Sequence, residues 1–332
     1  MSEPSPAIGP APAPAPADGA PAGSGAAASL PTVLRRQHDC QQGAVRAARL
    51  SADGAFCLTA GSDKTLKLWN PYRGTHLKTY LGHGHEVLDA AGACDNSRLL
   101  SCGADKAVIV WEVSSGRVLN KWRSHAAAVT CCRFSEDASL ALSGSVDGSV
   151  RAFDCRSRRT EPVQTLDEAT DSVTALQITD HEIVSGSADG RVRRYDLRNG
   201  RLTTDTVGDS VTCVTLSRDG QCLLVGCMDA TVKLLDRETG ELLNEFSGHA
   251  NRQYPLGSCL DAADAHVLSG SEEGAVYCWE LVSGKLAAKL THPRAAVVHS
   301  LAFHPSRAAL VTAAGGAFFL WDTGEEAEGE EQ

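Results

Sequence analysis

The chain has 332 residues, with 31 basic and 41 acidic side chains and a net charge of −10. This charge argues against a surface for duplex nucleic acid, which is normally basic. No apolar run approaches the roughly 18 to 20 residues of a membrane-spanning helix. The N-terminus also lacks a basic segment followed by an apolar one, so we expect no membrane contact and no secretory signal. The 12 cysteines are then expected to be reduced thiols in the cytoplasm or nucleus.

The two ends of the chain differ in composition from its middle. Residues 1–30 contain 10 Ala, 7 Pro and 4 Gly, a composition that suits polyproline II and cannot build a packed core. Residues 324–332 contain five Glu and no basic residue. We therefore predict a disordered Ala/Pro-rich tail over 1–30, one folded domain over 31–323, and an acidic disordered tail over 324–332.

Between the tails, a β-forming segment recurs seven times. Each copy ends in a large apolar residue, at Trp69, Trp111, Phe153, Tyr195, Leu235, Trp279 and Trp321, with spacings of 42, 42, 42, 40, 44 and 42 residues. Six residues before each of the first six stands an acid, at Asp63, Asp105, Asp147, Asp189, Asp229 and Glu273. Gly or Lys after the acid is typical of a hairpin turn in most copies. Each unit is therefore predicted to contain four short strands.

Period, turn acid, terminal Trp and an upstream Gly-His pair such as Gly82-His83 occur together, and in this the chain resembles the WD-repeat (WD40) family. The resemblance implies an all-β fold, a seven-bladed β-propeller over residues 31–323. After Trp321-Asp322 no apolar segment remains for a fourth strand of the last blade, and Thr32–Arg36 is available for it. We therefore expect the N-terminal strand to pair into the last blade and close the ring, because an open edge would otherwise remain.

Ser, His and Asp recur in several units, which first suggests catalysis. A catalytic site needs one such group rather than several copies, so a buried structural tetrad is the better interpretation, as the family uses it. The predicted members are His83, Ser101, Asp105 and Trp111 in blade two, and His125, Ser143 and Asp147 in blade three. Blade five has Val225 and Leu235, and blade seven has Gly315-Gly316 in its turn, so both are expected to be looser. No catalytic, zinc-binding or nucleotide-binding motif is present, and we predict no enzyme activity, no metal and no cofactor.

Six residues are predicted to contact partners. The resemblance implies that the residue before a turn acid faces the top surface of the ring. The stretch Asn251–Pro255 is one residue longer than its counterparts, which favours an exposed Tyr254 beside Arg252, although a Tyr packed at a strand start is the alternative. The candidate partner-binding residues are Arg46, Ser62, Met228, Arg252, Tyr254 and Glu272.

Arginines cluster in blades three and four, either on a solvated face or as a contact for an acidic partner or RNA. They are Arg156, Arg158, Arg159, Arg191, Arg193, Arg194 and Arg198. Two of them belong to Phe153-Asp154-Cys155-Arg156 and Tyr195-Asp196-Leu197-Arg198, which resemble the paired motifs of substrate receptors for cullin-RING ubiquitin ligases. Arg156 and Arg198 are therefore candidate ligase-adaptor contacts.

Longer stretches, among them Gly61–Pro71, Glu86–Gly92 and Asp189–Leu197, resemble one group of WD-repeat scaffold proteins. This resemblance implies a monomeric, non-enzymatic scaffold in the cytoplasm and nucleus. Its implied partners are components of the extracellular-signal-regulated (MAP) kinase cascade, spliceosomal proteins of pre-mRNA splicing, and a hypoxia-related prolyl hydroxylase. The alternative function is a substrate receptor of a cullin-RING ubiquitin ligase.

Overall fold

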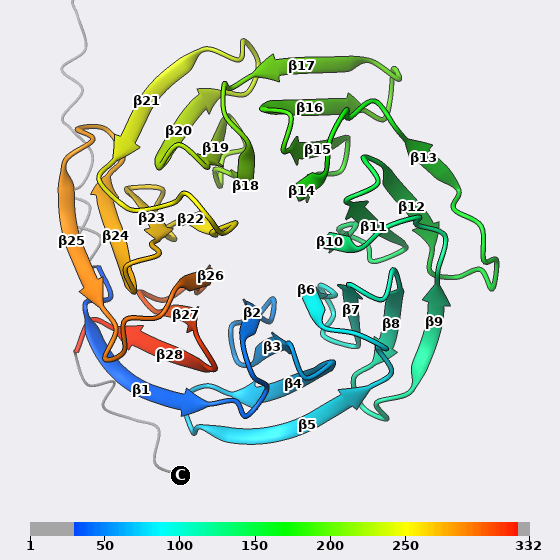
Figure 1. Cartoon of the computed structure of the whole chain (residues 1–332), viewed down its shortest axis with the longest axis horizontal. Coiled ribbons are helices and arrows are strands. Elements are labelled where there is room, and N and C mark those ends of the chain that lie inside the picture. Colours follow the sequence, from blue (N-terminus) through cyan, green and yellow to red (C-terminus); the bar gives the residue numbers. More distant parts are fainter. Residues whose placement is uncertain (1–29, 325–332) are drawn as a thin grey trace, which may run out of the picture.

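The computed structural model describes residues 30–324. Its regular elements are 28 strands, which form seven four-stranded antiparallel sheets arranged around a ring (Figure 1). This confirms the predicted seven-bladed β-propeller. Within the described residues there is no helix long and apolar enough to cross a membrane. The two predicted tails lie outside the described residues, apart from Leu30 and Gly324.

In blades one to six, the first strand lines the ring centre and the fourth forms the rim. Blades one to three comprise β2 (Val45–Leu50), β3 (Cys57–Gly61), β4 (Thr65–Asn70) and β5 (Thr75–Leu81); β6 (Val87–Gly92), β7 (Arg98–Gly103), β8 (Val108–Glu112) and β9 (Val118–Trp122); and β10 (Val129–Phe134), β11 (Leu140–Ser145), β12 (Val150–Asp154) and β13 (Gln164–Leu166). Blades four to six comprise β14 (Val173–Ile178), β15 (Glu182–Ser187), β16 (Arg191–Asp196) and β17 (Leu202–Thr206); β18 (Val211–Leu216), β19 (Cys222–Cys227), β20 (Thr231–Asp236) and β21 (Leu242–Ser247); and β22 (Ser258–Leu260), β23 (His266–Gly270), β24 (Ala275–Glu280) and β25 (Leu286–Thr291).

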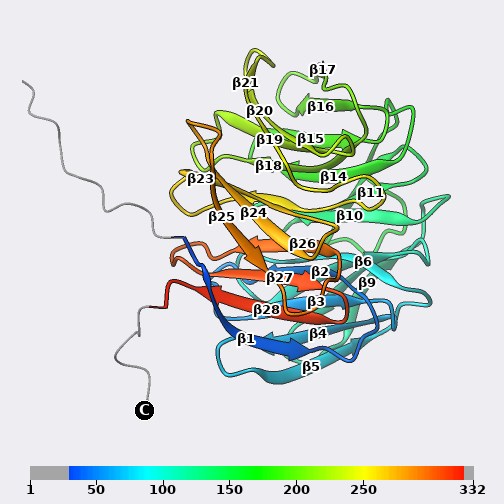
Figure 2. The same cartoon turned by 60° about the vertical axis from the view of Figure 1, so that its left-hand side comes forward.

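Blade seven joins the first and last strands of the described chain. It contains β26 (Val298–Phe303), β27 (Leu310–Ala314), β28 (Ala317–Asp322) and, as its outer strand, β1 (Val33–Asp39). β1 runs antiparallel to β28 from the Val33–Asp322 pair to the Asp39–Ala317 pair. The two strands lie side by side in both views, dark blue against red (Figures 1 and 2). The N-terminal strand therefore closes the ring, as the sequence predicted.

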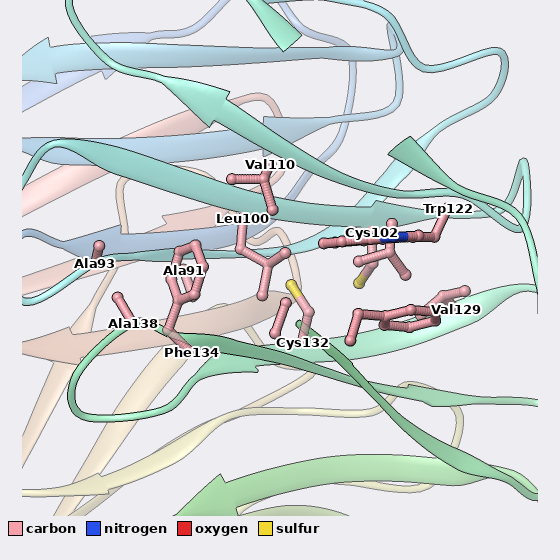
Figure 3. Packing of buried hydrophobic residues seen from close by; sticks show 13 residues of the cluster. Ala91, Ala93, Leu100, Cys102, Val110, Trp122, Val129, Cys132, Phe134 and Ala138 are labelled. Carbon is pink, nitrogen blue, oxygen red and sulfur yellow. The ribbon is translucent and has the colours of Figure 1, made fainter. Parts of the chain in front are cut away.

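Apolar side chains fill the spaces between neighbouring blades. Between blades two and three, Leu100 and Trp122 pack with Cys132 (Figure 3). Phe153 belongs to the same cluster, and its ring stacks on Trp122 with centroids 4.7 Å apart. Small residues complete this cluster, which suits a chain with only 5% aromatic residues. Burial of each large side chain contributes about 1.5–3 kcal/mol. All 12 cysteines are free, and burial raises the pKa of Cys40 to about 12, so this one stays an inert thiol.

Hydrogen bonds from side chains on the inner strands also join neighbouring blades. The Thr174 hydroxyl on β14 donates to Val211 O on β18 at 2.7 Å, and the Gln177 amide donates to Val214 O at 3.0 Å. The Thr215 hydroxyl on β18 donates to Ser258 O on β22 at 3.0 Å. These bonds hold the centre of the ring, where the candidate site lies.

Candidate interaction site at the central cavity

In blade two, four side chains form one hydrogen-bonded chain from core to turn. The Trp111 indole N–H donates to Ser101 Oγ at 2.8 Å, and the Ser101 hydroxyl donates to His83 Nε2 at 2.8 Å. The opposite ring nitrogen, His83 Nδ1, carries the proton because its partner, Asp105 Oδ1 at 2.9 Å, can only accept. Ser101 and His83 are buried, so each polar atom of the chain is satisfied away from water.

Asp105 connects these hydrogen-bonded side chains to the loop that precedes blade two. Its second oxygen accepts the Gly84 N–H at 2.8 Å. Burial alone would raise the pKa of Asp105, but the hydrogen bonds from His83 and Gly84 outweigh it and lower that pKa to about 2. The carboxylate is therefore ionised at neutral pH and acts as a fixed acceptor.

Blade three repeats the arrangement without the indole. His125 Nε2 lies 2.8 Å from Ser143 Oγ, and His125 Nδ1 lies 3.0 Å from an Asp147 oxygen. The Trp position holds Phe153, whose ring stacks on Trp122 instead. Burial lowers the pKa of His125 despite the neighbouring Asp147 carboxylate, so the ring is neutral at neutral pH.

In blade one, a glutamine amide takes the place of the histidine in the hydrogen-bonded network. Gln42 is fully buried, and its Oε1 accepts the Thr59 hydroxyl at 2.6 Å, while Thr59 Oγ1 accepts the Trp69 indole N–H at 2.9 Å. The Gln42 amide N–H donates to Thr65 Oγ1 at 3.0 Å, which in turn donates to Asp63. This role of Gln42 was not predicted from the sequence, because the repeating pattern has a histidine there. The available signal was its position three residues before β2, the first strand of blade one.

Blade seven keeps three members. His292 Nε2 lies 2.8 Å from Thr312 Oγ1, which also accepts the Trp321 indole N–H at 3.1 Å. Its turn holds Gly315-Gly316 in place of the acid, and His292 Nδ1 donates to Gly274 O at 3.1 Å instead. Burial lowers the pKa of His292 to about 4.

Blade four replaces the histidine with a buried ion pair. Arg193 Nη2 lies 2.6 Å from an Asp189 oxygen, and Arg194 Nη2 lies 3.1 Å from Asp205. Both arginine side chains are almost fully buried. The prediction of a solvated face or contact patch is therefore wrong for these two residues, because the first acidic partner lies in the turn and the second on β17.

Blade six keeps the histidine, but this histidine does not join a hydrogen-bonded network of the described residues. His249 is buried, yet neither of its ring nitrogens has a hydrogen-bond partner among residues 30–324. Ser269 donates to the carbonyl of Gly270 at 3.2 Å, and Glu273 accepts from the Tyr277 hydroxyl at 3.1 Å. Burial lowers the pKa of His249 to about 4, so the ring is neutral at neutral pH.

A carboxylate holds the loop that precedes this blade's first strand. Glu272 Oε1 accepts the backbone N–H groups of Arg252, Gln253 and Tyr254 at 2.8, 2.5 and 3.1 Å. Burial alone would raise the pKa of Glu272, but these three donors lower it. The strand β22 begins only at Ser258, so Tyr254 belongs to a loop rather than to a strand start. Glu272 therefore supports the loop through its backbone.

The loop borders a cavity of about 600 Å³ at the ring centre, lined by residues of all seven innermost strands. Tyr254 is 40% exposed, and its ring lies edge-on to His299, with centroids 5.6 Å apart. Arg46 lines the same cavity and pairs with Glu86 at 3.3 Å. Burial and the Arg46 charge lower the pKa of His299 to about 4. Tyr254, His299 and Arg46 therefore contribute an aromatic ring, a neutral imidazole and a guanidinium to the lining of the cavity.

Deeper in the cavity, a buried carboxylate joins three blades. Asp89 on β6 accepts from Arg49 on β2 at 3.0 Å and from Arg133 on β10 at 2.8 Å. Burial alone would raise the pKa of Asp89, but the two guanidinium groups lower it. The sequence contained one signal for this site: an Asp in an inner-strand register where other units carry Ala, Cys, Ser or Gly.

The remaining predicted residues lie outside the cavity. Ser62 is half-buried, and its Oγ accepts the Ala44 N–H at 2.9 Å, so it takes part in its own turn. Met228 is half-buried in the turn between β19 and β20. Arg156 and Arg198 are exposed at matching positions after β12 and β16, where they pair with Asp137 at 3.1 Å and Asp196 at 3.8 Å.

Within the described part of the chain, no group of three or more His, Cys, Asp or Glu side chains could hold a metal ion. The histidines of blades two, three and seven are each bonded to a serine or threonine of the same blade. Of the predicted partner-binding residues, Tyr254 and Arg46 both line the cavity.

Comparisons with known proteins agree with the fold. The family model of the N-terminal domain of nucleolar protein 10-like proteins, a β-propeller, matches residues 32–253, more than half of the chain. WD repeat domain-containing protein 83 of Mus musculus is 57% identical over 304 residues, covering 91% of this chain and 96% of that protein. The proteins of the same name from Homo sapiens and Danio rerio are 59% and 62% identical, covering 88% and 89% of this chain and 92% and 93% of theirs. The chain therefore belongs to the WD-repeat family of β-propellers, in the group of WD repeat domain-containing protein 83.

Proposed function

We propose that this propeller is a non-enzymatic scaffold whose protein partners bind at the mouth of the central cavity. The observation that supports this is the loop fixed by Glu272, which places Tyr254 at the cavity that Arg46 also lines. Tyr and Arg are enriched among residues that dominate binding energy. Because three backbone N–H groups of the loop share one carboxylate, little ordering cost is left for the binding step.

By resemblance, the partners are components of the MAP kinase cascade and spliceosomal proteins, with a hypoxia-related prolyl hydroxylase as a third. We further propose that the chain works as a monomer in the cytoplasm and the nucleus. A ring with two faces and a rim can hold several proteins at once and so raise their effective concentration. That property is what a kinase scaffold and an assembly factor for splicing have in common.

The experiment is affinity purification of the full chain from cytoplasmic and nuclear lysates, with quantitative mass spectrometry. The variants are Tyr254→Ala and Leu243→Ala, the latter an exposed apolar residue on the outer strand β21. We expect the parent and Leu243→Ala to recover kinase-cascade and splicing proteins equally, and Tyr254→Ala to lose them about tenfold or more.

The thermal midpoint of each variant must be measured beside its recovery. An unchanged midpoint for Tyr254→Ala, together with lost partners, supports a contact role. A fall in the midpoint shows that Tyr254 packs the loop instead, and full recovery of partners by Tyr254→Ala refutes the proposed surface.

A second candidate function is a substrate receptor of a cullin-RING ubiquitin ligase. The exposure of Arg156 and Arg198 at matching positions of neighbouring blades favours it. The double variant Arg156→Ala/Arg198→Ala in the same purification separates the two proposals. Loss of a cullin-ligase adaptor from this variant alone would favour the receptor, whereas unchanged recovery of all partners would make the arginine pair incidental.

A further inference from the structure

The connection between β12 and β13 differs from its counterparts in the other blades. It spans nine residues, 155–163, whereas the corresponding turns in blades two, four, five and six span five, as in residues 113–117. The outer strand that follows, β13, is correspondingly short, with three residues. In Figure 1 this segment projects from the ring beside β9. Long ordered loops on a rigid fold are often functional.

Side chains of blade two hold the backbone of this loop. Asn120 donates to Ser157 O at 3.1 Å, the Trp122 indole N–H donates to Arg159 O at 2.9 Å, and the Ser124 hydroxyl donates to Thr160 O at 3.2 Å. Trp122 is itself buried in the core between blades two and three. Thr160 is therefore held at a fixed place against the end of β9.

Thr160 borders a basic pocket of about 580 Å³. The other lining residues are Lys121, Arg123, Ser124, Arg151 and Glu161, so three cations face one carboxylate. Arg123 is exposed and forms no hydrogen bond or ion pair with any residue of 30–324. Lys121 Nζ has one bond, to Gly82 O at 2.7 Å, and keeps further N–H groups free. This concentration of positive charge lies on a molecule whose net charge is −10.

Arg151 completes the wall of the pocket. Its guanidinium donates to Ser124 O and to Ser149 Oγ, so it is already oriented, and it lies 4.0 Å from Asp147. Glu161 is exposed, and water screens its charge. The pocket thus offers the guanidinium N–H groups of Arg123 and the ammonium group of Lys121 to an oxyanion, and Arg151 adds a third positive charge in a fixed orientation.

We propose that Thr160 is a phosphorylation site and that this pocket is the receptor for its phosphate. Thr160 is exposed, and its hydroxyl forms no hydrogen bond within the described chain. The segment Arg156-Ser157-Arg158-Arg159-Thr160 places three arginines before the acceptor, which suits a protein kinase with an acidic substrate groove. Ser157 is less suitable, because it is half-buried and its Oγ accepts the Arg159 N–H at 3.1 Å.

In the modification, Thr160 Oγ1 attacks the γ-phosphorus of a nucleoside triphosphate. A bond between Oγ1 and phosphorus forms, the bond from that phosphorus to the β–γ bridging oxygen breaks, and the nucleoside diphosphate leaves. The hydroxyl proton passes to the general base of the kinase. The new group carries a charge of about −1.5 to −2 and accepts charge-assisted hydrogen bonds from Arg123 and Lys121. It ties the loop of blade three to β9 of blade two and cancels most of the basic charge on this rim.

The test begins with the full chain, a basophilic Ser/Thr kinase and ATP with magnesium, followed by peptide mapping. A free peptide of residues 154–166 is the positive control, and Thr160→Ala and Ser157→Ala are matched variants. We expect one phosphate on Thr160 in the parent and in Ser157→Ala, and none in this segment of Thr160→Ala. A peptide that is modified while the folded chain is not, or phosphate on Ser157 alone, overturns the site. If the kinase does not phosphorylate the peptide, the argument that the three arginines make Thr160 a kinase substrate is overturned.

Hydrogen exchange then tests the receptor pocket. Phosphorylation is expected to slow amide exchange in residues 155–163 on the order of tenfold in the parent, and much less in Arg123→Gln, which keeps the loop contacts. No change in exchange, or an equal change in both chains, overturns the pocket as receptor. Binding of free O-phosphothreonine is measured before and after Thr160 is phosphorylated. If the unmodified chain binds it tightly and phosphorylation does not weaken this binding, the pocket takes a phosphate from a partner, and the proposal is overturned.

Discussion

At the scale of single residues, hydroxyl groups decide whether each blade satisfies its buried polar atoms. Ser101 accepts the Trp111 N–H and donates to His83, so one oxygen serves two buried nitrogen atoms. The corresponding Ser269 of blade six bonds only to the carbonyl of its neighbour. Removal of these two equally buried hydroxyls should therefore have unequal effects.

We predict that Ser101→Ala lowers the free energy of unfolding by about 2–4 kcal/mol, because two buried groups lose their partner. Ser269→Ala should cost about 1 kcal/mol or less. Urea denaturation of both variants and the parent measures the difference. Equal losses would show that the hydrogen bonds of Ser101 contribute nothing beyond the packing of its hydroxyl oxygen.

Histidines in the ring make stability depend on pH. The pKa of His292 is about 4 in the folded chain and 6.5 in the unfolded one. Between these values the unfolded chain binds the extra proton, so this contribution to stability is complete above pH 6.5 and declines as the pH falls toward 4. The amide of Gln42 performs the equivalent bonding in blade one without a titratable group.

His292→Gln should therefore flatten the pH profile. We expect the parent to lose about 2 kcal/mol more than the variant between pH 7 and pH 5, measured by urea denaturation at both values. The Gln side chain can still accept from Thr312, so the stability of the variant at pH 7 should change by about 1 kcal/mol or less. Parallel profiles for the two chains would contradict the assignment of this pH dependence to His292.

At the scale of elements, β1 differs from the other outer strands. It is the first strand of the described chain, but it belongs to blade seven, whose other three strands are the last. Leu34 packs against the core of blades six and seven, and Arg35 pairs with Asp322 at 2.6 Å. Without β1, the strand β28 would expose an unpaired edge next to apolar side chains, a hazard for aggregation.

A chain that starts at Cys40 should therefore lose about 10 °C or more in its thermal midpoint and aggregate on concentration. A peptide of residues 30–39, added in trans, should restore most of the lost stability by pairing with β28. Differential scanning calorimetry and light scattering follow both effects. A truncated chain that melts like the parent would show that β1 does not fasten the ring.

Most of this architecture could be predicted from the sequence, because a period of about 42 residues runs through all seven blades and a turn acid occurs in the first six. The occupants of individual positions were harder to predict. Gln42 takes the place of a histidine in blade one, and Arg193 binds the turn acid Asp189 in blade four. Side chains of different types can reach a buried hydroxyl or a turn acid, so spacing alone does not determine which one does. The hydrogen bonds between Glu272 and the loop backbone depend on the path of that loop, and residue spacing alone does not determine this path.

At the scale of the whole molecule, Asp89 joins blades one, two and three at the ring centre through Arg49 and Arg133. Asp89→Asn leaves two partly buried guanidinium groups without their counterion, and such a change costs about 3–5 kcal/mol. The variant should unfold at lower urea concentration with an unchanged slope, since the surface exposed on unfolding is the same.

The double variant Asp89→Asn/Arg133→Met serves as the control for this prediction. It should recover part of the loss, because one of the stranded charges is replaced by an apolar side chain of similar length. No recovery, or no loss in the single variant, would contradict a structural role for the carboxylate in the centre of the ring.

Gly324 lies against Val33, so the two ends of the described chain meet at the rim of blade seven. A short peptide could join them there, and new termini could be opened within residues 155–163 on the opposite part of the ring. Such a circular permutant would keep the inter-strand bonds of every blade while changing which blade leaves the ribosome first. If it reaches the same stability as the parent at a different folding rate, the order of the blades along the chain governs only how the ring is assembled.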